Sequence, residues 1–102
     1  MNTEIKDKWI TALRSGQYKQ GKHRLRDNDK FCCLGVLCDV VDKTKWEDTE
    51  FGIGYMGETH VMPENLAKSV NLSHIDCSFL AGLNDYKEYT FDQIADYIQQ
   101  NL

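Results

Sequence analysis

A basic segment near the N-terminus is the part of the sequence best suited to hold an anion. Directly after Tyr18, the eight residues from 19 to 26 carry Lys19, Lys22, His23, Arg24 and Arg26. Lysine and arginine can bind a phosphate, and an aromatic ring can stack on a base. Acidic residues follow at once and the chain carries a net charge of −4, which argues against duplex DNA and favours a small phosphorylated or nucleotide-like ligand. A solvated basic face without a ligand is the alternative interpretation.

A ligand pocket built on this segment would give its side chains different roles. We expect Arg24 and Arg26 to hold the anion and Tyr18 to stack. Polar partners from a distant loop, Asn84 or Asp85, would fix a base or ribose edge. The full set of predicted ligand-binding residues is Tyr18, Gln20, Lys22, Arg24, Arg26, Asn84 and Asp85.

The cysteines have two further possible functions, as ligands of a zinc ion or as a thiol nucleophile. Structural zinc sites favour cysteine pairs two to four residues apart, whereas Cys32 and Cys33 are adjacent within an apolar stretch. A nucleophilic cysteine needs a nearby base, and no spacing in the chain brings His23 or His60 to one. We therefore predict that Cys32, Cys33, Cys38 and Cys77 are reduced thiols packed in the core.

No catalytic motif accompanies these residues. A Walker loop, a nucleophile elbow and an HExxH pair are all missing from the sequence. We predict a protein that is not an enzyme and that has no catalytic residues, no metal and no cofactor. A small thiol or zinc-dependent enzyme centred on Cys32, Cys33 and His23 is kept as an alternative.

The charge is distributed unevenly along the chain. Residues 1–38 carry eight Lys and Arg against four Asp and Glu, a net +4, and residues 39–102 carry four against twelve, a net −8. Such asymmetry favours an anionic ligand on the basic half, or two halves that attract each other in the fold.

Length and composition fit one small domain. With 102 residues and 41% hydrophobic residues, the chain can bury one core, and we expect a single domain over residues 1–102. No apolar run is long enough for a membrane span, and the charged N-terminus does not resemble a signal peptide, so we expect a cytoplasmic protein. A homo-oligomer is compatible with this size, because pooled surfaces build a larger pocket.

The elements that would position these residues are mainly helices. Amphipathic spacing and cap residues predict helices from Asn2 or Thr3 to Leu13, Cys33 to Lys43, Pro63 to Val70, Cys77 to Leu83, and one capped by Thr90 with Gln93. Gly35 inside the second helix indicates a close packing contact, since glycine otherwise costs a helix about 1 kcal/mol. The glycine-rich stretch from Phe51 to Met62 predicts a hairpin turning near Gly57, after a polar connector over Lys43 to Glu50. The predicted fold is α+β, with about four helices around a small antiparallel sheet or hairpins.

Several phrases of the sequence resemble a family of small proteins found in tailed phages and prophages. They are Trp9 to Gly16, Tyr18 to Lys22, Leu25-Arg26, Phe31 to Asp39, Leu83 to Asp85 and Thr90 to Ile98. The resemblance covers about two thirds of the chain and omits Lys43 to Met62. The family has no assigned function, so the resemblance implies a setting and not a mechanism.

That setting is the cytoplasm of a bacterial host. The resemblance implies a phage accessory protein that inhibits or sequesters a host component, which could belong to host defence, by binding a small phosphorylated or nucleotide ligand. The alternative is a protein–protein inhibitor of a host enzyme that uses an aromatic surface around Trp46, Phe51 and Tyr55.

Overall fold

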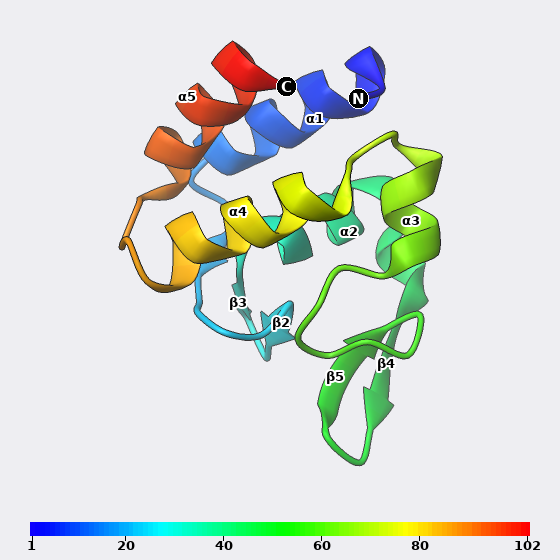
Figure 1. Ribbon diagram of the computed structural model, residues 1–102. Helices are drawn as coiled ribbons and strands as arrows, with labels where there is room; N and C mark the ends of the chain where they lie inside the picture. Colours follow the sequence, from blue (N-terminus) through cyan, green and yellow to red (C-terminus); the bar gives the residue numbers. More distant parts are fainter.

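The computed structural model describes residues 1–102 and has the α+β architecture expected from the sequence (Figure 1). Its elements, in chain order, are α1 Thr3–Arg14, β1 Lys19–Gln20, β2 Arg26–Asp27, β3 Lys30–Phe31, α2 Cys33–Asp42, a 3-10 turn Lys43–Lys45, β4 Trp46–Thr49, β5 Gly52–Tyr55, α3 Glu64–Ser69, α4 His74–Asp85 and α5 Phe91–Asn101. None of these helices has the length and apolar composition needed to cross a lipid bilayer.

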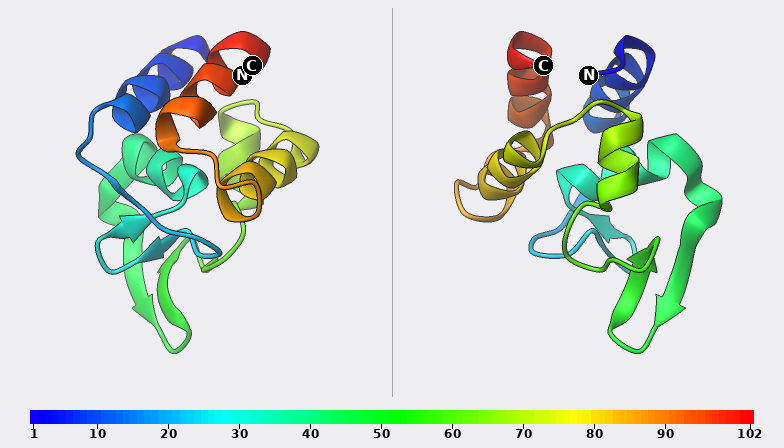
Figure 2. Two further views of the ribbon diagram at one scale, coloured as in Figure 1. Left: turned by 90° about the vertical axis from the view of Figure 1, so that its left-hand side faces the viewer. Right: turned by 45° about the vertical axis from the view of Figure 1, so that its right-hand side comes forward.

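The five helices surround one core, and the strands extend from it. Helices α1 and α5 lie side by side at one end, and the β4–β5 hairpin projects from the opposite end (Figures 1 and 2). The second sheet is a three-stranded one with the order β1-β3-β2, in which β1 pairs parallel and β2 antiparallel with β3. Both chain termini lie near each other at the α1–α5 end (Figure 2).

Local sequence signals explain where the helices begin and end. The side chain of Asn2 accepts a hydrogen bond from the Ile5 amide at 3.0 Å and starts α1, and Gly16 ends it with a φ of 75°. At α5, Thr90 and Gln93 form the predicted capping box, each side chain bonded to the other residue's backbone. Both predicted helices are confirmed.

Helix α2 is the central element of the core. All its residues from Cys33 to Cys38 are buried, and Trp9 of α1 donates from Nε1 to the Cys33 carbonyl oxygen at 2.9 Å. The close contact expected at Gly35 is confirmed, because a Cβ placed there would lie 1.7 Å from the Leu25 carbonyl oxygen. Only glycine lets the segment before β2 approach α2 this closely.

The predicted hairpin has the wrong partner strand. Strand β5 pairs with β4, so the turn lies at Glu50 and Phe51, and only one isolated bridge joins Tyr55 to Glu58 across the predicted turn. The segment 46–49 is a strand and not the expected polar connector. It forms a strand because Trp46 packs edge-on against Tyr55, with ring centroids 4.9 Å apart. The acidic residues next to Trp46 give no indication of this strand in the sequence.

Helix α4 is longer than predicted. It begins at His74 because the Ser73 hydroxyl accepts a hydrogen bond from the Asp76 amide at 3.0 Å, and it continues to Asp85. Asn84 and Asp85, expected from the sequence to lie in a loop, are therefore in the last turn of the helix, and Asn84 is fully buried.

Candidate functional site

A small cleft opens among the three short strands of the basic segment. Its volume is about 330 Å³, no apolar residue lines it, and its lining residues are Gln20, Gly21, Lys22, Arg24, Asp27 and Lys30. Three cations and one carboxylate give the lining a formal charge of +2. The predicted residues Gln20, Lys22 and Arg24 therefore come together, and we call this site the basic cleft.

The backbone that shapes the basic cleft is held by the neighbouring strands. The Gly21 amide donates to the Phe31 carbonyl oxygen at 2.8 Å, and a Cβ on Gly21 would lie 3.0 Å from the Cβ of Lys30. Leu25 is fully buried and its amide donates to the Thr59 carbonyl oxygen at 2.9 Å. The loop between these anchors leaves the amides of Lys22 and Arg24 without a hydrogen-bond acceptor in the protein.

The three cations of the basic cleft differ in how they are held. Arg24 donates from Nη1 to the Phe51 carbonyl oxygen at 2.7 Å, a contact that leaves its other guanidinium hydrogens free. The Lys22 ammonium lies 3.2 Å from the Glu88 carboxylate, and both side chains are exposed. Lys30 forms no ion pair or side-chain hydrogen bond. The cleft thus presents one cation held by a backbone carbonyl, one paired with an exposed carboxylate and one without a partner, which suits an anion that binds from solvent.

Asn84 lies behind the basic cleft and serves the fold. Its Oδ1 accepts from Gln20 Nε2 at 2.9 Å and from the Cys33 amide at 3.2 Å, and its Nδ2 donates to the Gly21 carbonyl oxygen and to Asp85 Oδ1, both at 2.9 Å. The side chain is fully buried and every donor and acceptor is in use. Asn84 thus has a structural role, and the predicted contact of Asn84 with a ligand would require one of these bonds to break.

Asp85 has a similar structural role. Its Oδ1 accepts from the His23 amide at 3.0 Å as well as from Asn84, and its Oδ2 lies 3.8 Å from His23 Nδ1. These bonds hold His23 in the left-handed backbone region, with a φ of 69°. Asp85 fixes the loop that carries Lys22 and Arg24, and its contact with a ligand stays a prediction.

Tyr18 and Arg26 belong to a separate aromatic cluster. Tyr18 packs edge-on against Phe31 at 5.1 Å and donates its hydroxyl to Asp39; burial, and then this bond, raise the pKa of Tyr18 to about 12. The Arg26 guanidinium lies over the rings of Phe31 and Trp46, 5.1 and 5.4 Å from their centroids. Neither side chain lines the basic cleft, so the predicted set is divided between two places.

The cleft also contains residues outside the predicted set. Gly21, Asp27 and Lys30 line it. Asp27 and Lys30 are cross-strand partners in the β2–β3 pair, on either side of a two-residue turn at Asn28 and Asp29. The turn residues Asn28 and Asp29 can be recognised in the sequence. The strand register, which places Asp27 and Lys30 opposite each other, cannot.

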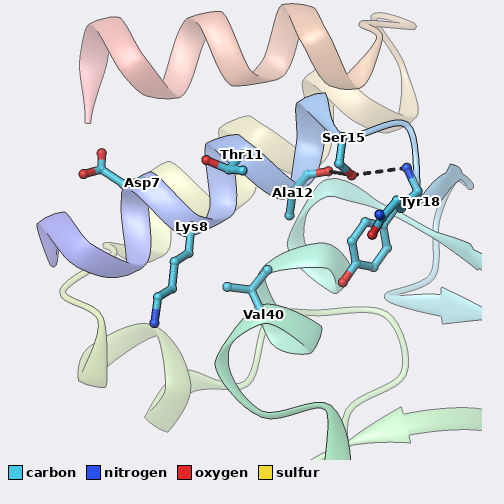
Figure 3. A pocket seen from close by; sticks show the side chains of 8 residues that line it. Asp7, Lys8, Thr11, Ala12, Ser15, Tyr18 and Val40 are labelled. Carbon is cyan, nitrogen blue, oxygen red and sulfur yellow. Dashed lines mark hydrogen bonds between the residues drawn. The ribbon is translucent and has the colours of Figure 1, made fainter.

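A wider groove lies between α1 and α2, and Figure 3 shows its lining. Its volume is about 580 Å³, it is more open than the basic cleft, and its lining residues are Asp7, Lys8, Thr11, Ala12, Ser15, Gln17, Tyr18 and Val40. The Ser15 hydroxyl donates to the Ala12 carbonyl oxygen at 2.6 Å and accepts from the Gln17 amide at 3.2 Å (Figure 3). Lys8 and Asp7 give the lining no net charge. The groove is larger than the basic cleft, but it has no excess charge with which to bind an ionic ligand.

The cysteines are buried, which argues against the thiol-enzyme alternative. Burial raises the pKa of Cys32 and of Cys77 to about 11, and raises the pKa of Cys33 and Cys38 as well. A protonated, inaccessible thiol is a poor nucleophile. No group of three or more His, Cys, Asp or Glu side chains is arranged to hold a metal ion.

The aromatic surface expected for a protein–protein inhibitor is smaller than its sequence suggests. Tyr55 is fully buried and donates its hydroxyl to the Asp42 carbonyl oxygen at 2.9 Å, and Trp46 is half-buried. Only Phe51, at the tip of the hairpin, is largely exposed, at 69%.

Comparison with known proteins places the chain in a family without an assigned activity. Residues 1–72 match a family model described as "Domain of unknown function (DUF8296)". No curated protein and no solved structure matches the chain. The matched segment contains the whole basic cleft and ends before α4, which supplies Asn84 and Asp85. Because the match spans more than half of the chain, the protein belongs to the family of this domain of unknown function, DUF8296.

Proposed function

We propose that the protein binds a small phosphorylated ligand in the basic cleft and acts by sequestering that ligand. One observation carries the proposal: Lys22, Arg24 and Lys30 surround a single small cleft. The amides of Lys22 and Arg24, which have no acceptor in the protein, belong to the loop that carries two of these cations. Charged donors and backbone amides together are the usual means by which proteins hold phosphate groups.

The magnitudes indicate how much a phosphate alone can contribute. A hydrogen bond to a charged group is worth about 1.5–3 kcal/mol. Association itself costs about 4–15 kcal/mol in lost translational and rotational freedom, and ordering the flexible lysines costs more. An isolated phosphate is therefore a weak ligand, and tight binding requires a molecule that uses further groups of the cleft.

The biological setting of the proposal is a phage or prophage. It is supported by the resemblance of the segments around Trp9 to Asp39 to small phage proteins. In this setting the protein acts in the bacterial cytoplasm and withdraws a phosphorylated compound, such as a nucleotide signal, from the host. The proposal requires no catalytic step, in keeping with the buried thiols.

Native mass spectrometry followed by calorimetry tests the proposal. We expect a retained small ligand, or binding of pyrophosphate or a nucleotide at low salt. Arg24→Ala and Lys30→Ala should each weaken the binding about tenfold or more. Lys43→Ala, an exposed lysine on the 3-10 turn, is the matched control and should leave the affinity unchanged. Equal affinities of all three variants and the native chain would place the ligand elsewhere.

Arg26→Ala separates the basic cleft from the aromatic cluster. Because the Arg26 guanidinium lies on Phe31 and Trp46, its loss should affect stability more than ligand affinity. An affinity loss as large as that of Arg24→Ala would extend the ligand site to the aromatic cluster.

A second candidate function is supported by the exposed hairpin tip. Phe51 is 69% exposed, and Met56 and Val61 are also exposed in the adjoining segment. An exposed aromatic anchor of this kind suits a protein–protein inhibitor. If this is the function, capture of a bacterial enzyme by the immobilised protein is lost in Phe51→Ala and kept in Arg24→Lys.

A further inference from the structure

We propose that the basic cleft selects a phosphorylated sugar, with Asp27 accepting hydrogen bonds from the sugar hydroxyls. This inference rests on the proposed function, since it names the class of ligand for the same site. The juxtaposition that carries it is one carboxylate, Asp27, among the three cations Lys22, Arg24 and Lys30.

Asp27 has acceptor capacity that the protein leaves unused. Its side chain faces Lys30 across the β2–β3 pair, yet the two form no ion pair within 4.0 Å. Its one side-chain partner is Asn28, whose Nδ2 lies 3.5 Å from Asp27 Oδ1. A carboxylate in a site for a simple phosphate would repel the ligand. Its presence in the lining therefore favours a ligand that brings hydrogen-bond donors as well as an anion.

Gln20 adds a second acceptor. Its Nε2 is bound to Asn84 and to the Tyr89 carbonyl oxygen, at 2.9 and 2.8 Å, and this holds the amide in one orientation. Its Oε1 accepts no hydrogen bond from the protein. The cleft consequently offers one held acceptor, Gln20, and one exposed acceptor, Asp27, next to cationic donors, a combination that matches the paired donor and acceptor capacity of adjacent hydroxyl groups.

The composition of the lining also limits the rest of the ligand. No apolar or aromatic side chain lines the basic cleft, whereas a buried base needs an apolar or aromatic contact. A volume of about 330 Å³ lies at the lower end of ligand sites. The cleft is thus suited to the sugar-phosphate part of a ligand, and any base attached to it would remain outside.

Four probes separate these contributions in calorimetric titrations of the full chain at low salt. Methyl phosphate and ribose 5-phosphate are both phosphate monoesters, but only the second has hydroxyl groups. We expect ribose 5-phosphate to bind about tenfold more tightly. AMP should bind within about threefold of ribose 5-phosphate, and ribose without phosphate should not bind measurably.

The variant Asp27→Asn gives a crossed prediction. It removes a negative charge and a strong acceptor, so it should tighten methyl phosphate and weaken ribose 5-phosphate, and the tenfold preference should fall to about twofold. Asp7→Asn makes the same charge change at an exposed position of α1, outside the basic cleft, and should alter neither affinity. Circular dichroism checks that the variants are folded. If Asp27→Asn does not fold, the probe comparison on the unmodified chain still decides the inference.

The outcomes distinguish this inference from the proposed function. Equal binding of methyl phosphate and ribose 5-phosphate would overturn the sugar selectivity and leave an anion site in place. A preference for AMP above about tenfold would overturn the exclusion of the base. If none of the phosphorylated probes binds, the proposed function fails and this inference fails with it.

Discussion

At the scale of single residues, Asn84 connects three segments that are distant in the sequence. Its four hydrogen bonds reach Gln20 and Gly21 of the basic segment, Cys33 at the start of α2, and Asp85 beside it. A buried amide with complete partners positions the backbone around it more strictly than apolar packing does, since each bond has a preferred direction. The shape of the basic cleft therefore depends on a residue outside the cleft.

Replacing Asn84 by Ala should be strongly destabilising. The change leaves the buried Cys33 amide and Gly21 carbonyl without partners, and we expect the free energy of unfolding to fall by about 3 kcal/mol. Urea denaturation followed by circular dichroism measures it. Asn65→Ala, at an exposed position of α3, is the control and should change it by less than about 0.5 kcal/mol. A loss below about 1 kcal/mol in Asn84→Ala would contradict the structural role.

The four cysteines should react slowly in the folded protein. All are buried, and the raised pKa values keep them protonated well above neutral pH. At about pH 8 we expect slow reaction with Ellman's reagent in native buffer and rapid reaction of all four thiols in urea. The native rate should rise steadily with pH up to about 11, because the pKa of the Cys32 and Cys77 thiols is about 11 and their thiolate fraction grows until that pH. Fast labelling of any one thiol at pH 8 would restore a thiol-based mechanism.

At the scale of elements, the contact between α2 and the segment before β2 determines how closely these two parts of the chain pack. The Leu25 carbonyl oxygen lies where the Cβ of residue 35 would be, and it also accepts a hydrogen bond from the Cys32 amide at 3.3 Å. The N-terminal turn of α2 thus binds the chain that carries Arg24 and Arg26. The helix and the basic segment are fixed to each other by backbone groups.

Gly35→Ala should disrupt this contact. The added methyl group would overlap a backbone carbonyl that cannot rotate away, so α2 must move, and we expect a loss of about 3 kcal/mol in unfolding free energy. Gly82→Ala on α4 is the matched control, because its added Cβ meets no atom within 4 Å. There the higher helix propensity of alanine should stabilise the protein by up to about 1 kcal/mol. Thermal unfolding of both variants would show shifts of opposite sign.

The elements also differ in how well the sequence predicts them. The predicted bounds of α1 and α2 and the predicted start of α5 are nearly correct, because these helices have a periodic apolar face and α1 and α5 also have a recognisable cap. The β4–β5 pairing is not predicted, since acidic side chains in β4 conceal a strand that is stabilised by Trp46 and Tyr55 across the pair. The predicted α4 is too short because its N-terminal cap, Ser73, lies in a stretch that is typical of a loop.

At the scale of the whole molecule, the last two helices complete a core that the first part of the chain begins. Helix α5 packs along α1, where Arg14 binds Asp96 at 2.7 Å and Gln99 at 3.2 Å, and its buried apolar residues belong to the same core as Trp9 and Leu13. The family match ends at Leu72, before either of these helices. The core of this chain therefore extends beyond the matched segment.

Removing residues 73–102 should leave a chain that does not fold. The truncation exposes the buried faces of α1 and α2 and also removes Asn84 and Asp85, so we expect low helicity and binding of a hydrophobic dye. Circular dichroism and dye fluorescence measure both effects. A cooperative thermal transition in the truncated chain would show instead that residues 1–72 form an independent unit.

The candidate site is less predictable than the helices. The basic segment can be identified from composition, and three of its predicted residues line one cleft. The role of Asn84 depends on distances that only the folded chain defines, because its partners lie 51 to 64 residues away. Asp27 and Lys30 escape recognition in the sequence, because strand pairing, and not sequence proximity alone, places them on one face.

The position of the chain ends has a practical consequence. Both termini lie at the α1–α5 end, and the hairpin lies at the opposite end, with the basic segment beside it (Figures 1 and 2). A tag, a fluorescent protein or a linker can therefore be attached at either terminus on the side of the molecule opposite the hairpin. A head-to-tail link between the ends would need only a short peptide, so circularly permuted forms with new termini elsewhere are accessible for this fold.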